Sequence, residues 1–174
     1  SGVPQGSVLG PILFLIFINN LDVQAALVTI IRKFADDTKL GQSIRTDEDK
    51  KVLQDSLNQL TDWANTWGMS FNVKKCVVMH FGHSNTATPY FMNGQQLERT
   101  KTERDIGVMV SDNLKPSAQC VKAAKTARQV LGQLGRAFHF RDRYTFVGLY
   151  KQYVLPHLEF ASQAWSPWSA KDRE

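Results

Sequence analysis

Apolar residues along this chain follow two helical patterns. From Gly10 to Leu21 nearly every position is apolar, which predicts a core helix, because a helix that is apolar all round has no face suited to water. Pro11 fits the first turn of that helix, where a missing N–H costs no hydrogen bond. In residues 46–68 the apolar positions recur every three or four residues, which predicts an amphipathic helix; they are Leu53, Leu57, Leu60, Ala64 and Trp67.

The ends of this amphipathic helix carry recognisable signals. Thr46 and Asp49 have the spacing of a capping box, and Gly68 closes the pattern, so the helix is expected to begin and end there.

A second amphipathic helix is predicted over residues 117–139. At 100° per residue, one arc of about 100° collects its apolar side chains, which are Val130, Ala123, Leu134, Ala127, Phe138 and Leu131. The opposite side carries the basic residues Lys122, Lys125, Arg128 and Arg136. A further helix, residues 145–154, is expected before Pro156.

Short strands are predicted between the helices. Residues 28–34 and 38–41 flank Ala35, Asp36 and Asp37. The β-branched run before the acids favours two strands joined by a tight turn, with both aspartates at the hairpin tip. Residues 69–81 are expected to form a strand with a turn-like Asn72.

Two further β segments complete the predicted fold. Asn93 and Gly94 predict a type I′ hairpin between residues 90–92 and 96–98. Residues 106–110 are expected to add a third strand to the same small sheet. The fold class is therefore α+β, a small antiparallel sheet with packed helices followed by a helical region. The change in pattern near Leu114 is the candidate boundary, separating residues 1–114 from 115–174.

Composition and charge narrow the functional classes. The 43% hydrophobic and 10% aromatic content is typical of a globular protein. The two cysteines have no partners at zinc-ligand spacing, so we expect a nuclear or cytoplasmic location and no secretion. No apolar run reaches the roughly 20 residues of a membrane-spanning helix. Residues 115–151 hold eight Lys or Arg against one Asp, which suits contact with a polyanion.

Two motifs carry candidate chemistry. Adjacent carboxylates at a hairpin tip, Asp36 and Asp37, can hold the hard divalent cations used in phosphoryl transfer; an exposed, solvated turn is the alternative. The loop from Gly2 to Ser7 precedes a helix, so its backbone could approach a phosphate or a base edge. The alternative is an ordinary Gly/Pro turn before a helix, which the residues of the loop by themselves favour.

Five segments of the chain, taken together, are typical of one protein family. The segments GVPQGSVLGPILFLIFINNL, KFADDTKL, WGMSFNVKKCVVMHFG, ERDIGVMV and LPHLEFASQAWSP resemble, in order and spacing, the reverse transcriptases of non-LTR retrotransposons. Within that family, the resemblance is to the chicken-repeat-1 and jockey-like elements, and it covers essentially the whole chain. It implies an RNA-directed DNA polymerase that uses Mg²⁺ or Mn²⁺, an RNA template, a DNA primer and dNTPs. It also implies that residues 1–114 are part of the polymerase palm and residues 115–174 a helical, thumb-like region.

The resemblance also implies roles for residues of the palm. Pro4, Gln5 and Gly6 match the loop that lines the nucleotide and template pocket. Asp36 matches the principal metal ligand and Asp37 a supporting one. Asn72 and Lys75 match an Asn-x-x-Lys block whose lysine lies near the nucleotide phosphates and protonates the leaving pyrophosphate; a solvated lysine remains the alternative for Lys75.

Further roles concern the nucleic acid. Asp105 and Gly107 match the hairpin that grips the primer end, where glycine permits close backbone contact. The basic helix, with Lys122, Lys125, Arg128 and Arg136, matches the start of the thumb that tracks the duplex backbone. A merely solvated face is the alternative for that helix.

Two departures from the family pattern limit the expected activity. The family's first metal-binding Asp lies on a strand upstream of the Gly2–Ser7 loop, and the chain begins at Ser1, so we interpret the chain as a piece of a longer polyprotein and expect no polymerisation by it alone. Asn19 and Asn20 stand where related elements usually have Asn-Asp. The alternative is a non-catalytic relic or a nucleic-acid-binding module derived from a retrotransposon.

Overall fold

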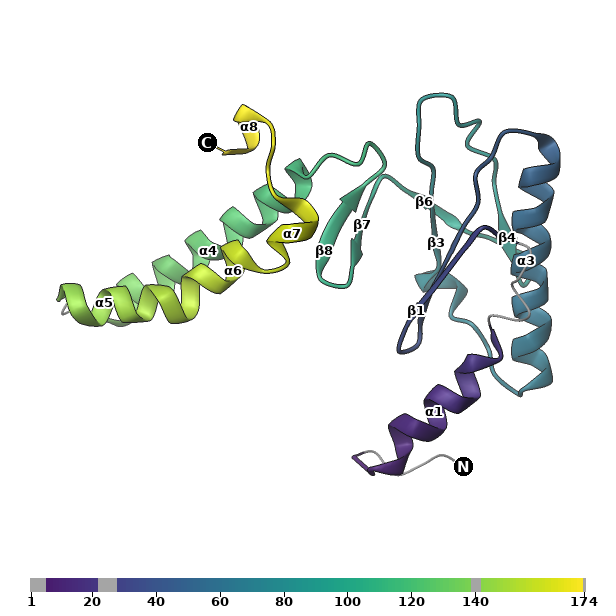
Figure 1. Ribbon diagram of the computed structural model, residues 1–174, viewed down its shortest axis with the longest axis horizontal. Helices are drawn as coiled ribbons and strands as arrows, with labels where there is room; N and C mark the ends of the chain where they lie inside the picture. The colour runs from purple at the N-terminus through teal and green to yellow at the C-terminus, as the bar shows by residue number, and fades with distance from the viewer. Residues whose placement is uncertain (1–5, 22–27, 139–141, 174) are drawn as a thin grey trace. The chain divides into compact units, whose positions relative to one another are not determined.

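The computed structural model describes residues 6–21, 28–138 and 142–173 (Figure 1). The chain separates into two compact units: residues 1–78 with 84–99, and residues 79–83 with 100–174. Helices are combined with small two-stranded pairs, which is consistent with the predicted α+β class. The candidate boundary at Leu114, where strands give way to helices, lies inside the second unit, so the limits of palm and thumb remain a prediction. No helix among the described residues is long and apolar enough to cross a membrane.

The first unit combines two helices with short strand pairs. Its elements are α1 (Leu9–Asn19), β1 (Ile30–Phe34), β2 (Asp37–Gly41), α3 (Asp47–Thr66), the 3₁₀ turn η1 (Val73–Lys75), β4 (Phe91–Met92), β5 (Gln95–Gln96), and all but the last residue of β3 (Val77–Met79) and β6 (Glu98–Thr100). β1 pairs with β2, β4 with β5, and β3 with β6. The core that these elements enclose consists of Ile18, Leu21, Leu60, Trp63, Ala64, Tyr90, Met92 and Leu97.

Helix α3 has the predicted boundaries. The Asp49 backbone N–H donates to Thr46 Oγ1 at 3.3 Å, and the Thr46 N–H donates to the Asp49 carboxylate at 2.7 Å, so the capping box is formed. Past the end of the helix, Gly68 has a φ of +66°. The apolar stripe was less well predicted, because Trp63 is buried while Trp67 is 49% exposed.

Helix α1 is helical as predicted, but the prediction that it is buried is wrong. Ile18 is its one buried residue, whereas Leu9, Leu15 and Ile16 are each more than 60% exposed. Phe14, Phe17 and Ile18 pack on the core at the C-terminal end of the helix. An all-apolar sequence favours helix throughout its length, but whether it is buried depends on what packs against each turn.

Three β predictions need correction. Residues 69–81 do not form one strand, because η1 interrupts them and leaves only β3. Ile106 and Gly107 form a turn and not the start of a strand. Among the described residues the strands form four separate two-stranded pairs and not one sheet. The Asn93-Gly94 hairpin is confirmed, since both residues have positive φ values, 52° and 71°, as a type I′ turn requires.

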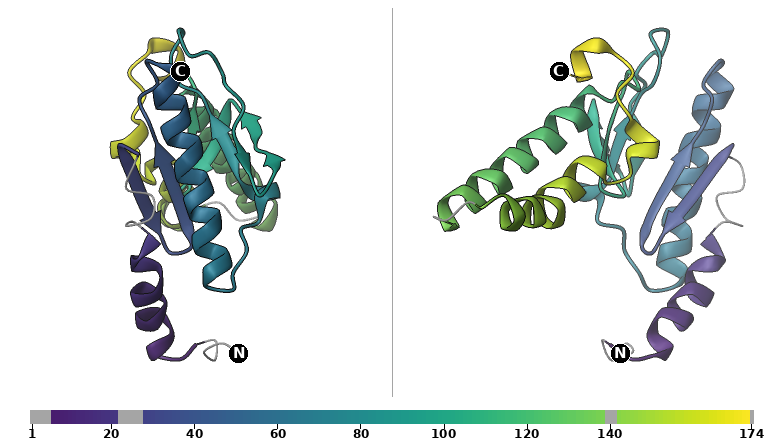
Figure 2. Two further views of the ribbon diagram at one scale, coloured as in Figure 1. Left: turned by 90° about the vertical axis from the view of Figure 1, so that its right-hand side faces the viewer. Right: turned by 60° about the vertical axis from the view of Figure 1, so that its left-hand side comes forward.

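The second unit pairs one hairpin with helices. Its elements are β7 (Thr102–Asp105), β8 (Val108–Ser111), α4 (Ser117–Ala137), α5 (Arg143–Leu149), the π-helical turn η2 (Tyr150–Val154), α6 (Leu155–Glu159), α7 (Ser162–Trp165) and α8 (Ala170–Arg173). Both η2 and α6 lie alongside α4 (Figures 1 and 2). The helix predicted for residues 145–154 therefore begins earlier and continues past Pro156. The π-helical turn ends at Val154, two residues before Pro156, which has no N–H to donate to the preceding turn.

Helix α4 has the predicted amphipathic character over a slightly shorter span. Ala123 and Ala127 are buried as expected, while Leu131 and Phe138 at the far end are 37% and 39% exposed. Gln119 is buried in the first turns, which the apolar pattern did not indicate.

Candidate active site

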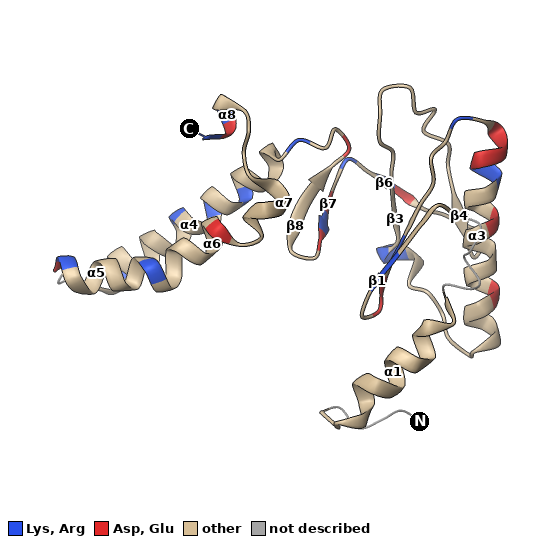
Figure 3. Cartoon of the chain, viewed as in Figure 1, with Lys and Arg blue, Asp and Glu red and all other residues tan. Residues whose placement is uncertain are grey.

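The two adjacent aspartates lie at the tip of the β1–β2 hairpin. Phe34 pairs with Asp37, so Ala35 and Asp36 form a two-residue turn, and Ala35 has a φ of 52°. Asp36 and Asp37 are both exposed. Figure 3 shows their acidic colour at the tip, with basic residues along the strands. The predicted tight turn between two strands is confirmed.

The hairpin is held on the first unit by apolar and polar contacts. Ile31 and Leu40, which are paired across the hairpin, pack against the core. The Lys33 ammonium donates to the carbonyl oxygens of Ile18 at 2.9 Å and Asn19 at 3.5 Å. These carbonyls lie at the C-terminal end of α1, where the helix dipole favours a cation. The acidic tip is thereby fixed to the C-terminal end of α1.

The donor set at the tip suits a divalent cation only in part. Carboxylate oxygens are the ligands that Mg²⁺ prefers. However, the described residues contain no group of three or more His, Cys, Asp or Glu that could hold a metal. Two carboxylates do not complete the oxygen ligands that two cations need, so the tip as described would supply only part of a two-metal site.

The predicted nucleotide loop is described only from Gly6 onward. Pro4 and Gln5 lie outside the described residues. Gly6 has a φ of +87°, and no atom of residues 8–21, 28–138 or 142–173 lies within 4 Å of the position that a Cβ would take. The Ser7 hydroxyl accepts a hydrogen bond from the Gly10 N–H at 3.1 Å, which satisfies one of the free donors at the start of α1. The loop therefore leads directly into α1.

Asn72 and Lys75 lie at the two ends of one short turn. The Lys75 N–H donates to the Asn72 carbonyl at 2.9 Å, and both residues are exposed. The Cys76 thiol donates to the same carbonyl at 3.4 Å, and burial raises the pKa of this thiol. The role of Lys75 in catalysis remains a prediction, as do all the site roles carried over from the family.

In the second unit, the β7–β8 hairpin and α4 are joined by hydrogen bonds. Gln119 Oε1 accepts from the Met109 N–H at 2.8 Å, and the Lys122 ammonium donates to the Gly107 carbonyl at 3.1 Å. Loss of hydration lowers the pKa of Lys122, with a smaller contribution from the Arg104 guanidinium. Sequence reasoning missed Gln119, although its spacing of four residues from Ala123 places it on the buried face.

The turn at Gly107 is already closely packed. Gly107 has a φ of +88°, and a Cβ there would lie 2.9 Å from the Phe160 ring. The Phe160 ring therefore packs against Gly107 in the space that a side chain at this position would need. Asp105, the other predicted primer-contacting residue, ends β7 opposite Val108.

The basic side of α4 is solvent-facing for most of its length. Lys125, Arg128 and Arg136 are exposed, whereas Lys122 is half-buried by its contact with the hairpin. Figure 3 shows these basic residues spaced along α4.

The matches to known proteins identify the class. Residues 1–134 match the family model for reverse transcriptase (RNA-dependent DNA polymerase). The chain therefore belongs to the reverse transcriptase family, which confirms the prediction of an RNA-directed DNA polymerase family.

The relatives are polymerases of jockey-like mobile elements, as predicted. The chain is 29% identical over 176 residues to the RNA-directed DNA polymerase from mobile element jockey of Drosophila funebris. It is 24% identical over 173 residues to the probable RNA-directed DNA polymerase from transposon X-element of Drosophila melanogaster. Each alignment covers 95% of this chain but 19% of the relative, so the chain spans about a fifth of these proteins. No solved structure matches it.

Proposed function

We propose that this chain is a palm and thumb portion of a retrotransposon reverse transcriptase that adds dNTPs to a DNA primer on an RNA template. The observation that carries the proposal is the exposed Asp36-Asp37 tip, held on the core of a chain that belongs to the family. Adjacent carboxylates on a fixed support are suited to two-metal phosphoryl transfer.

Within this proposal the first unit contributes part of the metal site. Asp36 is the main ligand and Asp37 a supporting ligand of Mg²⁺ or Mn²⁺, and a third carboxylate comes from another part of the polyprotein. When bound, the cations would activate the primer hydroxyl and neutralise the leaving phosphates. Lys75 would contact those phosphates, and Pro4, Gln5, Gly6 and Asn72 the nucleotide.

The second unit would hold the nucleic acid. Lys125, Arg128 and Arg136 present a row of exposed cations along α4, which suits a phosphate backbone. Lys122 has a different place in this arrangement, because its ammonium is bound to the Gly107 carbonyl. Lys122 would hold the β7–β8 hairpin against α4, so that Asp105 meets the primer close to the basic helix. The close approach at Gly107 is made by Phe160, so Gly107 would shape this turn and not contact the primer through its own backbone.

Primer extension tests the catalytic part of this proposal. With oligo-dT on poly-rA and magnesium, the 174-residue chain alone is expected to incorporate no dNTP, because the described residues bring no third carboxylate to the Asp36-Asp37 tip. A longer polyprotein that includes the upstream strand is expected to extend the primer. The substitution Asp36→Asn in that polyprotein should slow the extension by a factor of at least about 100. Asp62→Asn, on α3, is the matched control. Magnesium-dependent extension by the short chain, or an active Asp36→Asn polyprotein, would contradict the proposal.

The charge distribution favours a second function, a nucleic-acid-binding module without catalysis. The second unit has twelve Lys or Arg against seven Asp or Glu, and the first unit has nine of each. The entire net charge of +5 therefore belongs to the unit that lacks the aspartate tip. If the longer polyprotein binds RNA and DNA with a steep salt dependence but never extends a primer, this second function holds instead. In either case, a nuclear or cytoplasmic location is proposed.

A further inference from the structure

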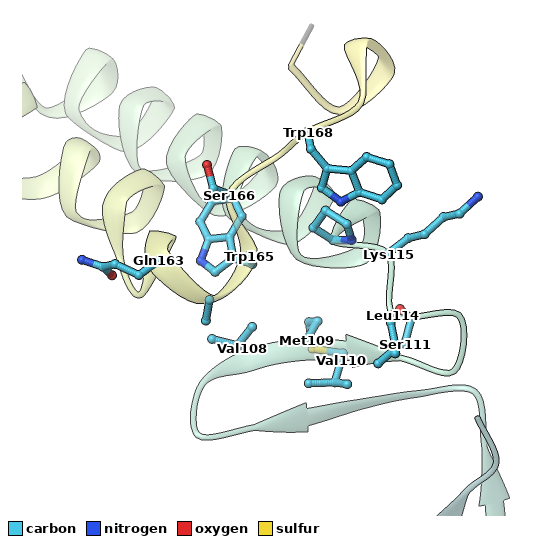
Figure 4. A pocket seen from close by; sticks show the side chains of 12 residues that line it. Val108, Met109, Val110, Ser111, Leu114, Lys115, Gln163, Trp165, Ser166 and Trp168 are labelled. Carbon is cyan, nitrogen blue, oxygen red and sulfur yellow. The ribbon is translucent and has the colours of Figure 1, made fainter. Parts of the chain in front are cut away.

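A small aromatic pocket in the second unit has no part in the proposed catalysis. It has a volume of about 290 Å³ and lies between β8, the segment before α4 and the region of α7. Its walls include Val108, Val110, Leu114, Lys115, Trp165 and Trp168. Figure 4 shows the two indole rings on the opposite side of the pocket from β8. This volume is at the low end for ligand sites, which suits one planar ring system.

The two tryptophans of the pocket differ in exposure. Trp165 is 9% exposed, and its indole N–H donates to the Phe160 carbonyl at 2.7 Å, so its ring is fixed in the protein. Trp168 is 67% exposed. A large aromatic ring left in water at the rim of a pocket is typical of a binding surface, because nothing within the fold covers it.

The backbone that carries Trp168 is nevertheless tied in place. Arg173 donates to the carbonyl oxygens of Pro167 at 3.2 Å and Trp168 at 3.3 Å. Asp172 accepts hydrogen bonds from the Ser169 hydroxyl at 2.7 Å and from Ser117, at the start of α4, at 2.9 Å. The exposed ring is therefore presented from a segment that is anchored to α4, which reduces the ordering cost of binding.

Charge indicates what kind of ring the pocket would take. Lys115 lines the pocket, is exposed, and extends outward on the Trp168 side in Figure 4. Lys171 is also exposed nearby in the chain, and the unit as a whole carries a net charge of +5. A ligand that is flat and apolar on its faces but attached to negative charge matches both features. An unpaired nucleobase on its phosphate backbone has that chemistry.

We propose that this pocket binds an unpaired base of single-stranded nucleic acid, which stacks on Trp168 while Lys115 contacts the adjacent phosphate. The inference rests on the proposed binding of nucleic acid by the second unit, but it uses residues other than the exposed cations of α4. It adds a contact with a single strand to the contact with duplex backbone proposed for that helix.

Titration of the 174-residue chain with 12-nucleotide oligo-dT or oligo-rU, monitored by tryptophan fluorescence, tests the pocket. The single strand is expected to quench the fluorescence. Trp168→Ala should weaken its binding about 10-fold, the scale of one lost base–aromatic stack, and leave binding of a blunt duplex within about twofold. Trp67→Ala is the matched control, because Trp67 is also exposed, at 49%, but belongs to the first unit. Trp168→Phe should retain most of the affinity.

An abasic oligonucleotide of the same length separates base stacking from charge. It should bind the wild-type chain as weakly as oligo-dT binds Trp168→Ala. Equal affinity of Trp168→Ala and wild type for oligo-dT, or of abasic and normal strands for the wild type, would overturn the pocket proposal. So would quenching by an uncharged apolar peptide without quenching by the oligonucleotide, which would indicate a protein ligand.

Charge reversal on α4 distinguishes failure of the pocket proposal from failure of the proposed nucleic-acid binding by the second unit. Lys125→Glu with Arg128→Glu should weaken single strand and duplex alike, whereas Trp168→Ala should weaken the single strand alone. If the α4 variant loses affinity and the Trp168 variant does not, the pocket inference alone is wrong. If neither variant changes the affinity, the proposed nucleic-acid contact of the second unit is wrong as well.

Discussion

The two units differ in charge and in how their surfaces are built. The first has equal numbers of acidic and basic residues and displays two carboxylates on a hairpin anchored by Ile31, Leu40 and Lys33. The second carries all of the net charge and displays cations along a helix. The two proposed functions, metal binding and nucleic-acid binding, need opposite local fields. The difference teaches that a chain can provide both fields when the acidic tip and the basic helix lie in separately packed units.

Core truncation in the first unit should produce the largest effect and test whether the units are energetically separate. Trp63 is 5% exposed and stacks near Phe17, with ring centroids 5.6 Å apart. Trp63→Ala should destabilise the first unit by about 3–5 kcal/mol, measured by hydrogen exchange of α3 amides. Amides of α4 should keep their protection within about threefold.

The control for this truncation keeps an aromatic ring at the same position. The Trp63 indole N–H is buried and has no hydrogen-bond partner within the part of the chain that the structure describes. Trp63→Phe removes that unsatisfied donor, so it should cost much less than Trp63→Ala. Equal loss of protection in α3 and α4 on Trp63→Ala would show that the two units unfold together.

A matched pair of glycines, one in each unit, should give the next largest difference. Gly94 and Gly107 both occupy hairpin turns at positive φ, but a Cβ at Gly94 meets open space, while one at Gly107 lies 2.9 Å from Phe160. Gly107→Ala should therefore lower the stability of its unit by about 2–3 kcal/mol, and Gly94→Ala by about 1 kcal/mol. Urea unfolding of each variant measures this difference, and Phe160→Ala should reduce the additional cost at Gly107. Equal costs for the two glycines would show that Phe160 does not restrict the turn.

These positions also show what the sequence could predict. The capping box at Thr46 and the Asn93-Gly94 turn were predictable because their signals are local: a few residues determine the hydrogen bonds and the φ values. The Asp36 hairpin was predictable for the same reason. The turn at Gly107 was not, because Ile106 precedes it in place of the Asn or Asp that usually marks such turns.

The remaining differences depend on contacts between distant residues. The apolar run of α1 specifies a helix but contains no information about what covers each turn, so its exposure could not be read from periodicity. Burial of Gln119 depends on a backbone donor at Met109, which is ten residues away on a different element. Likewise, the pocket of Trp165 and Trp168 arises where α7 meets β8, a contact that no local pattern indicates.

Charge reversal on α4 should produce a smaller effect, a loss of affinity for nucleic acid that charge reversal in the first unit does not cause. Lys125→Glu with Arg128→Glu is expected to reduce affinity for duplex nucleic acid about 10-fold and to lower the slope of log affinity against log salt by about 2. Arg45→Glu with Lys51→Glu makes the same change in charge at exposed positions of the first unit and should leave the affinity within about twofold. Fluorescence anisotropy at several salt concentrations measures both. An equal loss for the two pairs would mean that total charge, and not the face of α4, determines binding.

The smallest expected effect is a pH dependence that should also remain within each unit. Hydrogen bonds from the backbone of Arg45 and Thr46 hold the pKa of Asp49 below its ordinary 3.8. In the second unit, the hydroxyls of Ser169 and Ser117 do the same for Asp172. A carboxyl whose pKa is lower in the folded state contributes stability above its unfolded pKa and loses it as the pH falls through the folded value.

Protection of α3 amides should therefore decline between pH 4 and more acidic conditions, and Asp49→Asn should flatten that decline without altering α4. Asp172→Asn should flatten the corresponding decline in protection of α4 amides without altering α3, because Asp172 anchors the Trp168 segment to the start of α4. If either substitution changes the pH profile of both helices equally, protonation is coupled across the whole chain and the two units do not respond to acid independently.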